Sequence, residues 1–111
     1  MTKRKVNILG TSYNLIETTN HPLLKTVDGV CGRYDKTILI ESDLLSGSVP
    51  VNNDLDAEIR AKNAMIKRHE ILHAYLNECG LLRYSNDELL VNCLATLLPK
   101  IYETYTEVGC I

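Results

Sequence analysis

The chain has 111 residues, of which 45% are hydrophobic and 23% are charged, and its formal net charge is −2. This length fits a single domain spanning residues 1–111, with no room for a second core. The apolar content is enough to bury a core without disulfide cross-links. No basic block stands out, which disfavours nucleic acid and anionic membranes as partners.

The sequence carries no pattern for export or membrane insertion, and we expect a cytoplasmic protein. The polar start TKRK is followed by VNILGTSYN rather than by a long apolar run, so no signal peptide is predicted. The most apolar stretch, LLVNCLATLLP, is too short and too interrupted to span a bilayer. The four cysteines form no CxxC pair, and we expect reduced, mostly buried thiols.

The first half of the chain is predicted to form strands and loops. Four short runs have the apolar patterns that predict strands: about 5–9, 13–17, 30–34 and 37–41. Turns are expected around Gly10-Thr11-Ser12 and at Asp35-Lys36, and residues 20–29 are predicted to form a loop.

The second half of the chain is predicted to be helical. The first long helix should run from about 55 to 79, with Asn53 or Asp54 as its N-cap and Gly80 ending it. The expected fold class is α+β, with a small antiparallel or mixed sheet from the N-terminal half packed on two main C-terminal helices.

A second helix is predicted to begin after Ser85 and to run to Leu98, packing antiparallel to the first. Pro99 should kink this helix or open a new helical segment, because proline cannot donate the backbone hydrogen bond. The remaining tail should hold some further helix and then fray.

The segment His69-Glu70-Ile71-Leu72-His73 is the strongest functional signal. Four-residue spacing on a helix places both imidazoles on one side, where they can reach one ion, and rotates Glu70 beside that ion. Two neutral imidazoles that hold zinc, with an adjacent carboxylate as general base, form the metallopeptidase arrangement. The competing interpretation is that both histidines are hydrogen-bonded core residues.

A catalytic zinc site needs a third protein ligand. Glu88, on the first turn of the second helix, is a better candidate than His21 in a loop or Glu78 on the solvated side of the first helix. Two other interpretations remain open from spacing alone. Ser85-Asn86-Asp87-Glu88 also fits a capping box, and Glu88 begins a polar stripe that could be a solvated helix face.

A family resemblance extends over about residues 30–101. HEILHAYLNECGL followed by NDELLVNCLATLLPKI resembles the short gluzincin-like metallopeptidases of the ImmA/IrrE kind, including small phage and Firmicute proteins and the minigluzincins. In these proteins an H-E-x-x-H helix precedes a helix with an E-x-x-x-(D/N)-x-x-A pattern that ends in leucines and a proline. Gly32-Arg33-Tyr34-Asp35 and Thr37-Ile38-Leu39-Ile40 resemble the strands before the family's active-site helix.

The resemblance implies a zincin-like minimal domain with Zn²⁺ as cofactor and a peptide or protein as substrate. It implies His69, His73 and Glu88 as zinc ligands and Glu70 as general base and acid. Asn92 would orient a histidine ring, although relatives often have Asp at this position.

No residue clearly matches the side chain that stabilises the oxyanion in larger gluzincins. Tyr84, Tyr102 and Tyr105 are candidates for this role, but each also fits an ordinary amphipathic tyrosine. We expect a substrate peptide to add as a strand along an edge strand at Thr37–Glu41.

The alternative function is a catalytically weak or inactive binding module that contacts a regulatory protein. In that case Cys110 or Glu107 from the tail would supply a fourth protein ligand and close the metal site. A third interpretation has no metal, with Glu88 as a helix cap and the two histidines in the core.

Overall fold

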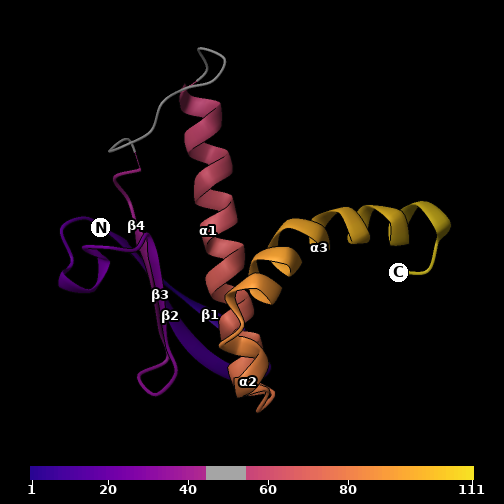
Figure 1. The fold of residues 1–111 in the computed structure, drawn as a ribbon, viewed down its shortest axis with the longest axis horizontal. Coiled ribbons are helices and arrows are strands. Elements are labelled where there is room, and N and C mark those ends of the chain that lie inside the picture. Colours follow the sequence, from indigo (N-terminus) through magenta and orange to yellow (C-terminus); the bar gives the residue numbers. More distant parts are fainter. Residues whose placement is uncertain (45–54) are drawn as a thin grey trace.

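The computed structural model describes residues 1–44 and 55–111 (Figure 1). The elements in chain order are β1 (Thr2–Ile8), β2 (Thr11–Thr18), the short 3-10 helix η1 (Pro22–Leu24), β3 (Gly29–Gly32), β4 (Thr37–Glu41), α1 (Leu55–Glu78), α2 (Leu82–Ser85) and α3 (Glu88–Val108). The predicted α+β class is confirmed, with the sheet in the N-terminal half and two main helices in the C-terminal half. The predicted N-cap at 53 or 54 lies outside the described residues.

The four strands form one mixed sheet in the order β1-β2-β4-β3. The first two predicted strands, β1 and β2, form an antiparallel hairpin, and Leu9 and Gly10 both have positive φ (52° and 89°) at its turn. β4 pairs in parallel with β2 and antiparallel with β3. The prediction that Thr37–Glu41 is an edge strand is therefore wrong, because β4 is paired on both sides and β3 forms that edge of the sheet.

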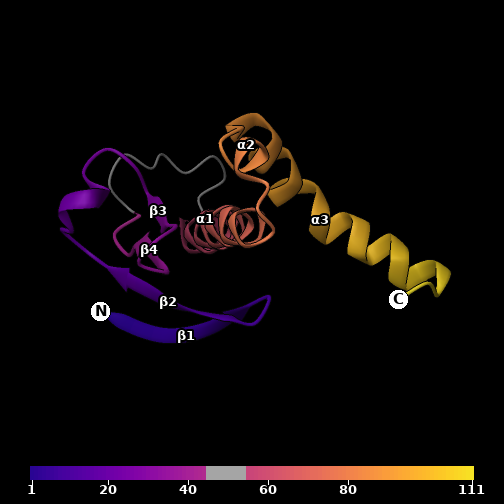
Figure 2. The ribbon, with the colours of Figure 1, turned by 90° about the horizontal axis from the view of Figure 1, so that it is seen from below.

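The core lies between the sheet and α1. Figure 2 shows α1 along one face of the strands, with α2 and α3 beyond it. The buried residues that pack together come from the sheet and from the middle of α1: Ile8, Tyr13, Leu15, Ile38, Ile40 and Ala74. This apolar contact fixes the side of α1 that faces β3, and thereby positions the histidine segment.

The first long helix, α1, ends where it was predicted to end. Gly80 follows the helix with a φ of 77°, a left-handed conformation that glycine adopts without steric cost. The predicted solvated position of Glu78 is corrected, because its side chain is only 14% exposed and pairs with Lys36 at 3.2 Å. Lys36 comes from the β3–β4 turn, so this ion pair ties the end of α1 to the sheet.

The start of α3 differs from the predicted capping box. Asp87 is the N-cap, and its carboxylate accepts a hydrogen bond from the backbone N–H of Leu90 at 3.1 Å. Ser85 instead ends the short helix α2, where it is buried. The proposal that Ser85 and Glu88 form a capping box is thus wrong, and Glu88 is free to turn toward α1.

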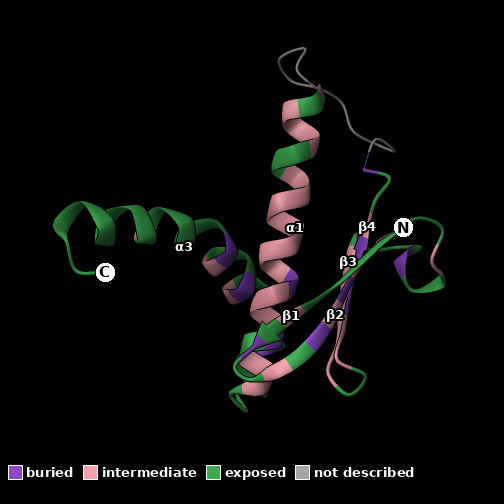
Figure 3. Cartoon of the chain, turned by 180° about the vertical axis from the view of Figure 1, so that it is seen from behind, coloured by how far each residue is buried: buried purple, intermediate pink, exposed green. Residues whose placement is uncertain are grey.

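The second half of α3 leaves the rest of the protein. α3 contacts α1 over its first half, as far as Thr96, and Figure 1 shows its second half extending away from α1, so the two helices do not pack along their whole length. Figure 3 shows that the projecting half is almost entirely exposed. The helix continues through Pro99 and ends at Gly109, which has a φ of 77°.

A side chain of α1 compensates for the proline within α3. Pro99 has no backbone N–H, so the carbonyl of Ala95, four residues earlier, loses its helical partner. Arg68 Nε donates to this carbonyl oxygen at 2.7 Å. The bond satisfies the carbonyl and fastens α3 to α1.

All four cysteines are free, as predicted, but they are not mostly buried. Cys31 is half-buried, whereas Cys79, Cys93 and Cys110 are exposed. The last two lie on or just after α3, whose exposure the sequence did not reveal. Among residues 1–44 and 55–111, no helix combines the length and the apolar character needed to cross a bilayer.

Replacing Arg68 by Met should lower the free energy of unfolding by about 1–3 kcal/mol, because the Ala95 carbonyl loses a charge-assisted hydrogen bond. Urea denaturation measures this loss, and Arg60→Met, on an exposed position of α1, is the matched control. In a Pro99→Ala background, residue 99 regains a backbone N–H that can bond to the Ala95 carbonyl. The loss of unfolding free energy caused by Arg68→Met should then be smaller. An equal loss with and without Pro99 would contradict this assignment.

Candidate metal centre

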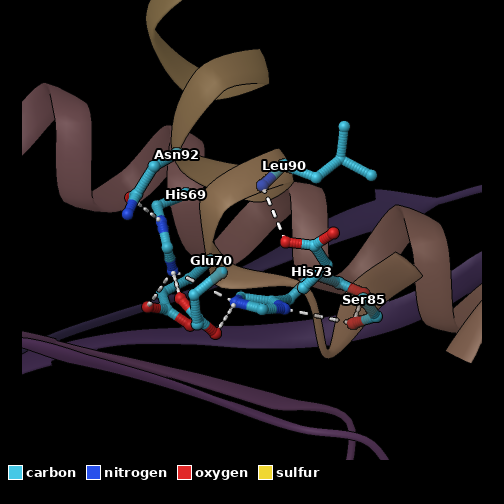
Figure 4. Close-up of polar contacts among 8 residues, drawn as sticks. His69, Glu70, His73, Ser85, Leu90 and Asn92 are labelled. Atoms are coloured by element: carbon cyan, nitrogen blue, oxygen red, sulfur yellow. Dashed lines mark hydrogen bonds and ion pairs between the residues drawn. The ribbon is translucent and has the colours of Figure 1, made fainter. Parts of the chain in front are cut away.

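Two imidazoles from adjacent turns of α1 converge on one point. The Nε2 atoms of His69 and His73 lie 3.1 Å apart, and the rings meet edge to face with centroids 4.8 Å apart (Figure 4). Both rings are mostly buried, with 16% and 13% of their side chains exposed. Burial lowers the pKa of His73, which favours the neutral imidazole that a metal ion requires.

The outer nitrogen of each ring has its own hydrogen-bond partner. His69 Nδ1 lies 2.8 Å from Asn92 Oδ1 on α3, and His73 Nδ1 lies 3.0 Å from Ser85 Oγ on α2. An amide oxygen only accepts, so His69 Nδ1–H donates to Asn92 and its Nε2 is left with a lone pair. Ser85 can donate its proton to the His73 carbonyl at 3.5 Å and accept from His73 Nδ1. This pattern directs two lone pairs at the same place, as in metal-bound histidines.

Glu88 brings a carboxylate to the same point from the first turn of α3. Its Oε2 lies 2.9 Å from His69 Nε2, and its Oε1 lies 3.0 Å from His73 Nε2. Atoms that bind one tetrahedral zinc at 2.0–2.1 Å are about 3.3 Å apart, so these three side chains have nearly the spacing of a shared ion. The Glu88 side chain is 62% exposed, which leaves one side of the group open to solvent.

Glu70 lies beside this group and is buried, with 7% of the residue exposed. Together, His69, Glu70 and His73 place their donor atoms within 4.8 Å of one another, a spacing compatible with a bound metal ion. Glu70 Oε2 is 3.9 Å from His69 Nε2, whereas Glu88 is close to both rings. These distances make Glu88 the better candidate for a third ligand and leave Glu70 beside the three side chains.

A glycine in β3 makes room for Glu70. A Cβ atom at Gly29 would lie 2.8 Å from Glu70 Oε2 and 2.9 Å from its Cγ, which is too close for any larger residue. Burial in this tight position, and then the negative charge of Glu88, raises the pKa of Glu70 to about 7. A carboxyl with such a pKa exchanges protons readily near neutral pH.

The side chains of His69, Glu70, His73 and Glu88 line a cavity of about 830 Å³. β3 forms one wall, and α1 with the start of α3 forms the other; lining residues include Gly29, Val30, Cys31, Ile66, Asn77 and Asn86. Burial, and then the charge of Glu70, raises the pKa of the Cys31 thiol to about 12. Cys31 is not among the residues whose donor atoms gather at the histidines, so its side chain forms part of the cavity wall.

The structure brings five predicted site residues together: His69, Glu70, His73, Glu88 and Asn92. His21 is elsewhere, where its Nδ1 accepts a hydrogen bond from the backbone of Leu23. Among the described residues, neither Glu107 nor Cys110 lines the cavity, and both lie at the far end of α3. A fourth ligand from the tail, as the alternative function requires, is therefore not supported.

The three tyrosines are not brought to the site. Tyr84, Tyr102 and Tyr105 are exposed, and none lines the cavity. Tyr102 and Tyr105 are carried away because α3 extends away from α1 beyond its first turns (Figure 1). Their suggested role in stabilising an oxyanion is not supported by the fold.

Sequence reasoning missed two residues, Ser85 and Gly29. Ser85 was assigned to a helix cap, and its true contact with His73 depends on the path of α2. Gly29 was placed in a loop, and only the packing of β3 against α1 reveals its contact with Glu70. No local sequence signal distinguishes either residue from an ordinary turn residue.

No protein-family model, curated protein or solved structure matches this chain. The case for a metal centre therefore depends on the geometry of the chain's own residues.

Removing either hydrogen-bond partner of the imidazoles should weaken metal binding. Ser85→Ala and Asn92→Ala should each lower zinc affinity by about 10–100-fold, because the rings lose the bonds that fix their orientation. Competition with a chromogenic chelator measures this affinity, and Ser12→Ala, on an exposed position of β2, is the control. Unchanged affinity in both variants would show that these contacts do not orient ligands.

Proposed function

We propose that the protein is a zinc-dependent metallopeptidase of minimal size. The observation that carries this proposal is the placement of Glu88 against both imidazoles, with Glu70 buried beside them. Two histidines and a carboxylate are a known zinc donor set, and three protein ligands leave a position for water. The resemblance of the two helix motifs to small gluzincins of the ImmA/IrrE kind supports the same function.

A zinc ion bound here would supply the Lewis acidity that activates water and polarises a peptide carbonyl. The residues of the chain do the rest. His69 and His73 hold the ion as neutral imidazoles, and Glu88 adds a negative charge. Glu70 accepts the proton of the attacking water and later delivers it to the leaving amine, a transfer that its raised pKa favours.

The edge strand β3 is the proposed support for an extended substrate. Among the described strands it pairs with β4 alone, and Gly29, Val30 and Cys31 line the cavity beside the two histidines. A peptide paired with β3 would use the free backbone groups of this edge and pass beside Glu70. The proposed substrate strand is therefore β3 rather than β4, because β4 is paired with β2 on one side and with β3 on the other.

A second candidate function is a regulatory binding module that keeps the metal but cleaves slowly or not at all. It is favoured by the positions of Tyr84, Tyr102 and Tyr105, none of which lines the cavity. In this case a protein partner, rather than a substrate, would occupy the cavity. Zinc binding alone does not separate the two functions, whereas cleavage does.

Replacing Glu70 by Gln should leave stoichiometric zinc in place and lower kcat/KM by about 10²–10⁴-fold, because the general base is lost. Cleavage of a peptide library, with zinc measured by plasma mass spectrometry, tests both parts. Glu103→Gln, on the exposed half of α3, is the matched control. His73→Ala should lose both zinc and cleavage.

Undiminished cleavage by Glu70→Gln would refute the general-base assignment. Zinc binding by the wild type without cleavage of any library peptide would favour the regulatory module. A wild-type protein that binds no zinc would exclude both the peptidase and the metal-containing regulatory module.

Replacing Gly29 by Ala should lower kcat/KM while zinc remains bound. The added methyl group would displace the Glu70 carboxylate, whereas the imidazoles and Glu88 do not contact this position. Thr19→Ala, in an exposed bend after β2, is the control. Loss of zinc in parallel with activity would indicate that Gly29 supports the whole site rather than Glu70 alone.

A further inference from the structure

β3 and α1 run in the same direction along the cavity. Gly29, at the start of β3, faces Ile66 and Glu70. Lys36, just after the strand, pairs with Glu78 at the end of α1 at 3.2 Å. A peptide that pairs with the outer edge of β3 therefore also follows α1 past the two histidines.

The two ends of this cavity differ in chemistry. Beside the first part of β3, apolar residues line it: Val27, Val30, Met65 and Ile66. Beyond the histidines, the cavity is lined by Asn77 on α1 and by Arg33 just after β3, and we call this part the Arg33 end. Ile66 and Asn77 are eleven positions apart on α1, which corresponds to about 16 Å. An extended peptide covers this length with about five residues.

Arg33 is the one lysine or arginine among the described residues that line the cavity. Its guanidinium lies 4.6 Å from the centroid of the Tyr34 ring and donates to the Tyr34 hydroxyl. This tyrosine is 85% exposed and uncharged, so it leaves the positive charge of Arg33 unbalanced. A guanidinium has several N–H donors, and most of them remain available for a ligand.

The nearby carboxylates are used by other groups. Asp35 accepts a hydrogen bond from the backbone N–H of Thr37 at 3.2 Å, within the turn that follows β3. Glu78 pairs with Lys36. Within residues 1–44 and 55–111, no carboxylate forms an ion pair with Arg33. A half-buried positive charge in the cavity wall thus has no anionic partner from the described part of the chain.

We infer that Arg33 binds a carboxylate of the peptide in the cavity and makes the site prefer peptides that carry this group at the Arg33 end. The inference rests on the proposed peptidase function. A planar guanidinium forms paired hydrogen bonds to a carboxylate, and Asn77 can add an amide N–H. The carboxylate belongs either to an acidic side chain about two or three residues from the cleaved bond, or to the C-terminus of a short peptide.

Binding of phosphinic peptides to the zinc-loaded full chain tests this inference without turnover. The phosphinate replaces the cleaved bond at the metal, so it fixes the position of every side chain along the cavity. One series has blocked termini and a single Glu or Gln at each position on either side. A second series has no acidic side chain and ends in a free or an amidated C-terminus at increasing distance. Calorimetry should find one position where the carboxylate form binds about tenfold more tightly than the neutral form.

Three variants decide whether Arg33 is the cause. Arg33→Gln should bind the two forms about equally, and Arg33→Glu should prefer a peptide with Lys at the same position. Arg83→Gln, on an exposed position of α2 that does not line the cavity, is the matched control and should keep the wild-type preference. Zinc content and circular dichroism check that each variant keeps the site and the fold.

Equal binding of both forms at every position would overturn the inference, as would a preference that persists in Arg33→Gln or a protein that binds none of these peptides. A preference that Arg33→Gln abolishes, in a protein that cleaves no library peptide, would support the role of Arg33 and count against the peptidase. Cleavage that is indifferent to acidic side chains and to the C-terminus would support the peptidase and overturn the role of Arg33. The series that shows the preference identifies the source of the carboxylate.

Discussion

The structure depends on a polar contact between α1 and the start of α3. Most of the core is an apolar contact between α1 and the sheet, and α3 adds two buried apolar residues, Val91 and Ala95. The two helices are joined in addition by His69 with Asn92, both imidazoles with Glu88, and Arg68 with the Ala95 carbonyl. These groups are partly or largely removed from water, so each needs its partner. A metal ion among them would add further to the same contact.

In the function that we propose, this arrangement would couple folding to metal binding. Two imidazole lone pairs and a carboxylate gathered within about 3 Å are best satisfied by a cation. Metal would therefore stabilise the junction as well as serve the chemistry that we propose. The two histidines come from α1 and Glu88 comes from α3. The short helix α2 between them provides Ser85, which hydrogen-bonds to His73. A small domain can in this way assemble a site without dedicated loops.

The sheet contributes to the site through one edge. β3 is only four residues long, yet it provides the wall of the cavity and the glycine against which Glu70 packs. Among the described residues, the outer edge of β3 pairs with no other strand, while β4 has strand neighbours on both sides. On the other side of the site, the second half of α3 leads away from the domain. The cap at Asp87 and the bond from Arg68 to the Ala95 carbonyl are two of the contacts that position the first half of α3.

The sequence alone determined the α+β class and the end of α1 at Gly80, because apolar periodicity and glycine positions are local signals. It also predicted that His69, Glu70, His73, Glu88 and Asn92 belong together, although spacing left Glu88 undecided between ligand and cap. Tertiary structure decided that Asp87 caps α3 and that Glu88 lies against both imidazoles, since the start of α3 and the path of α2 depend on contacts between helices. It alone decided that β4 is interior, that α3 projects, and that the glycine of β3 adjoins the buried glutamate. The order of the strands, the direction of α3 and the close contact between Gly29 and Glu70 arise from packing between segments distant in the sequence. A local sequence pattern carries no information about such packing.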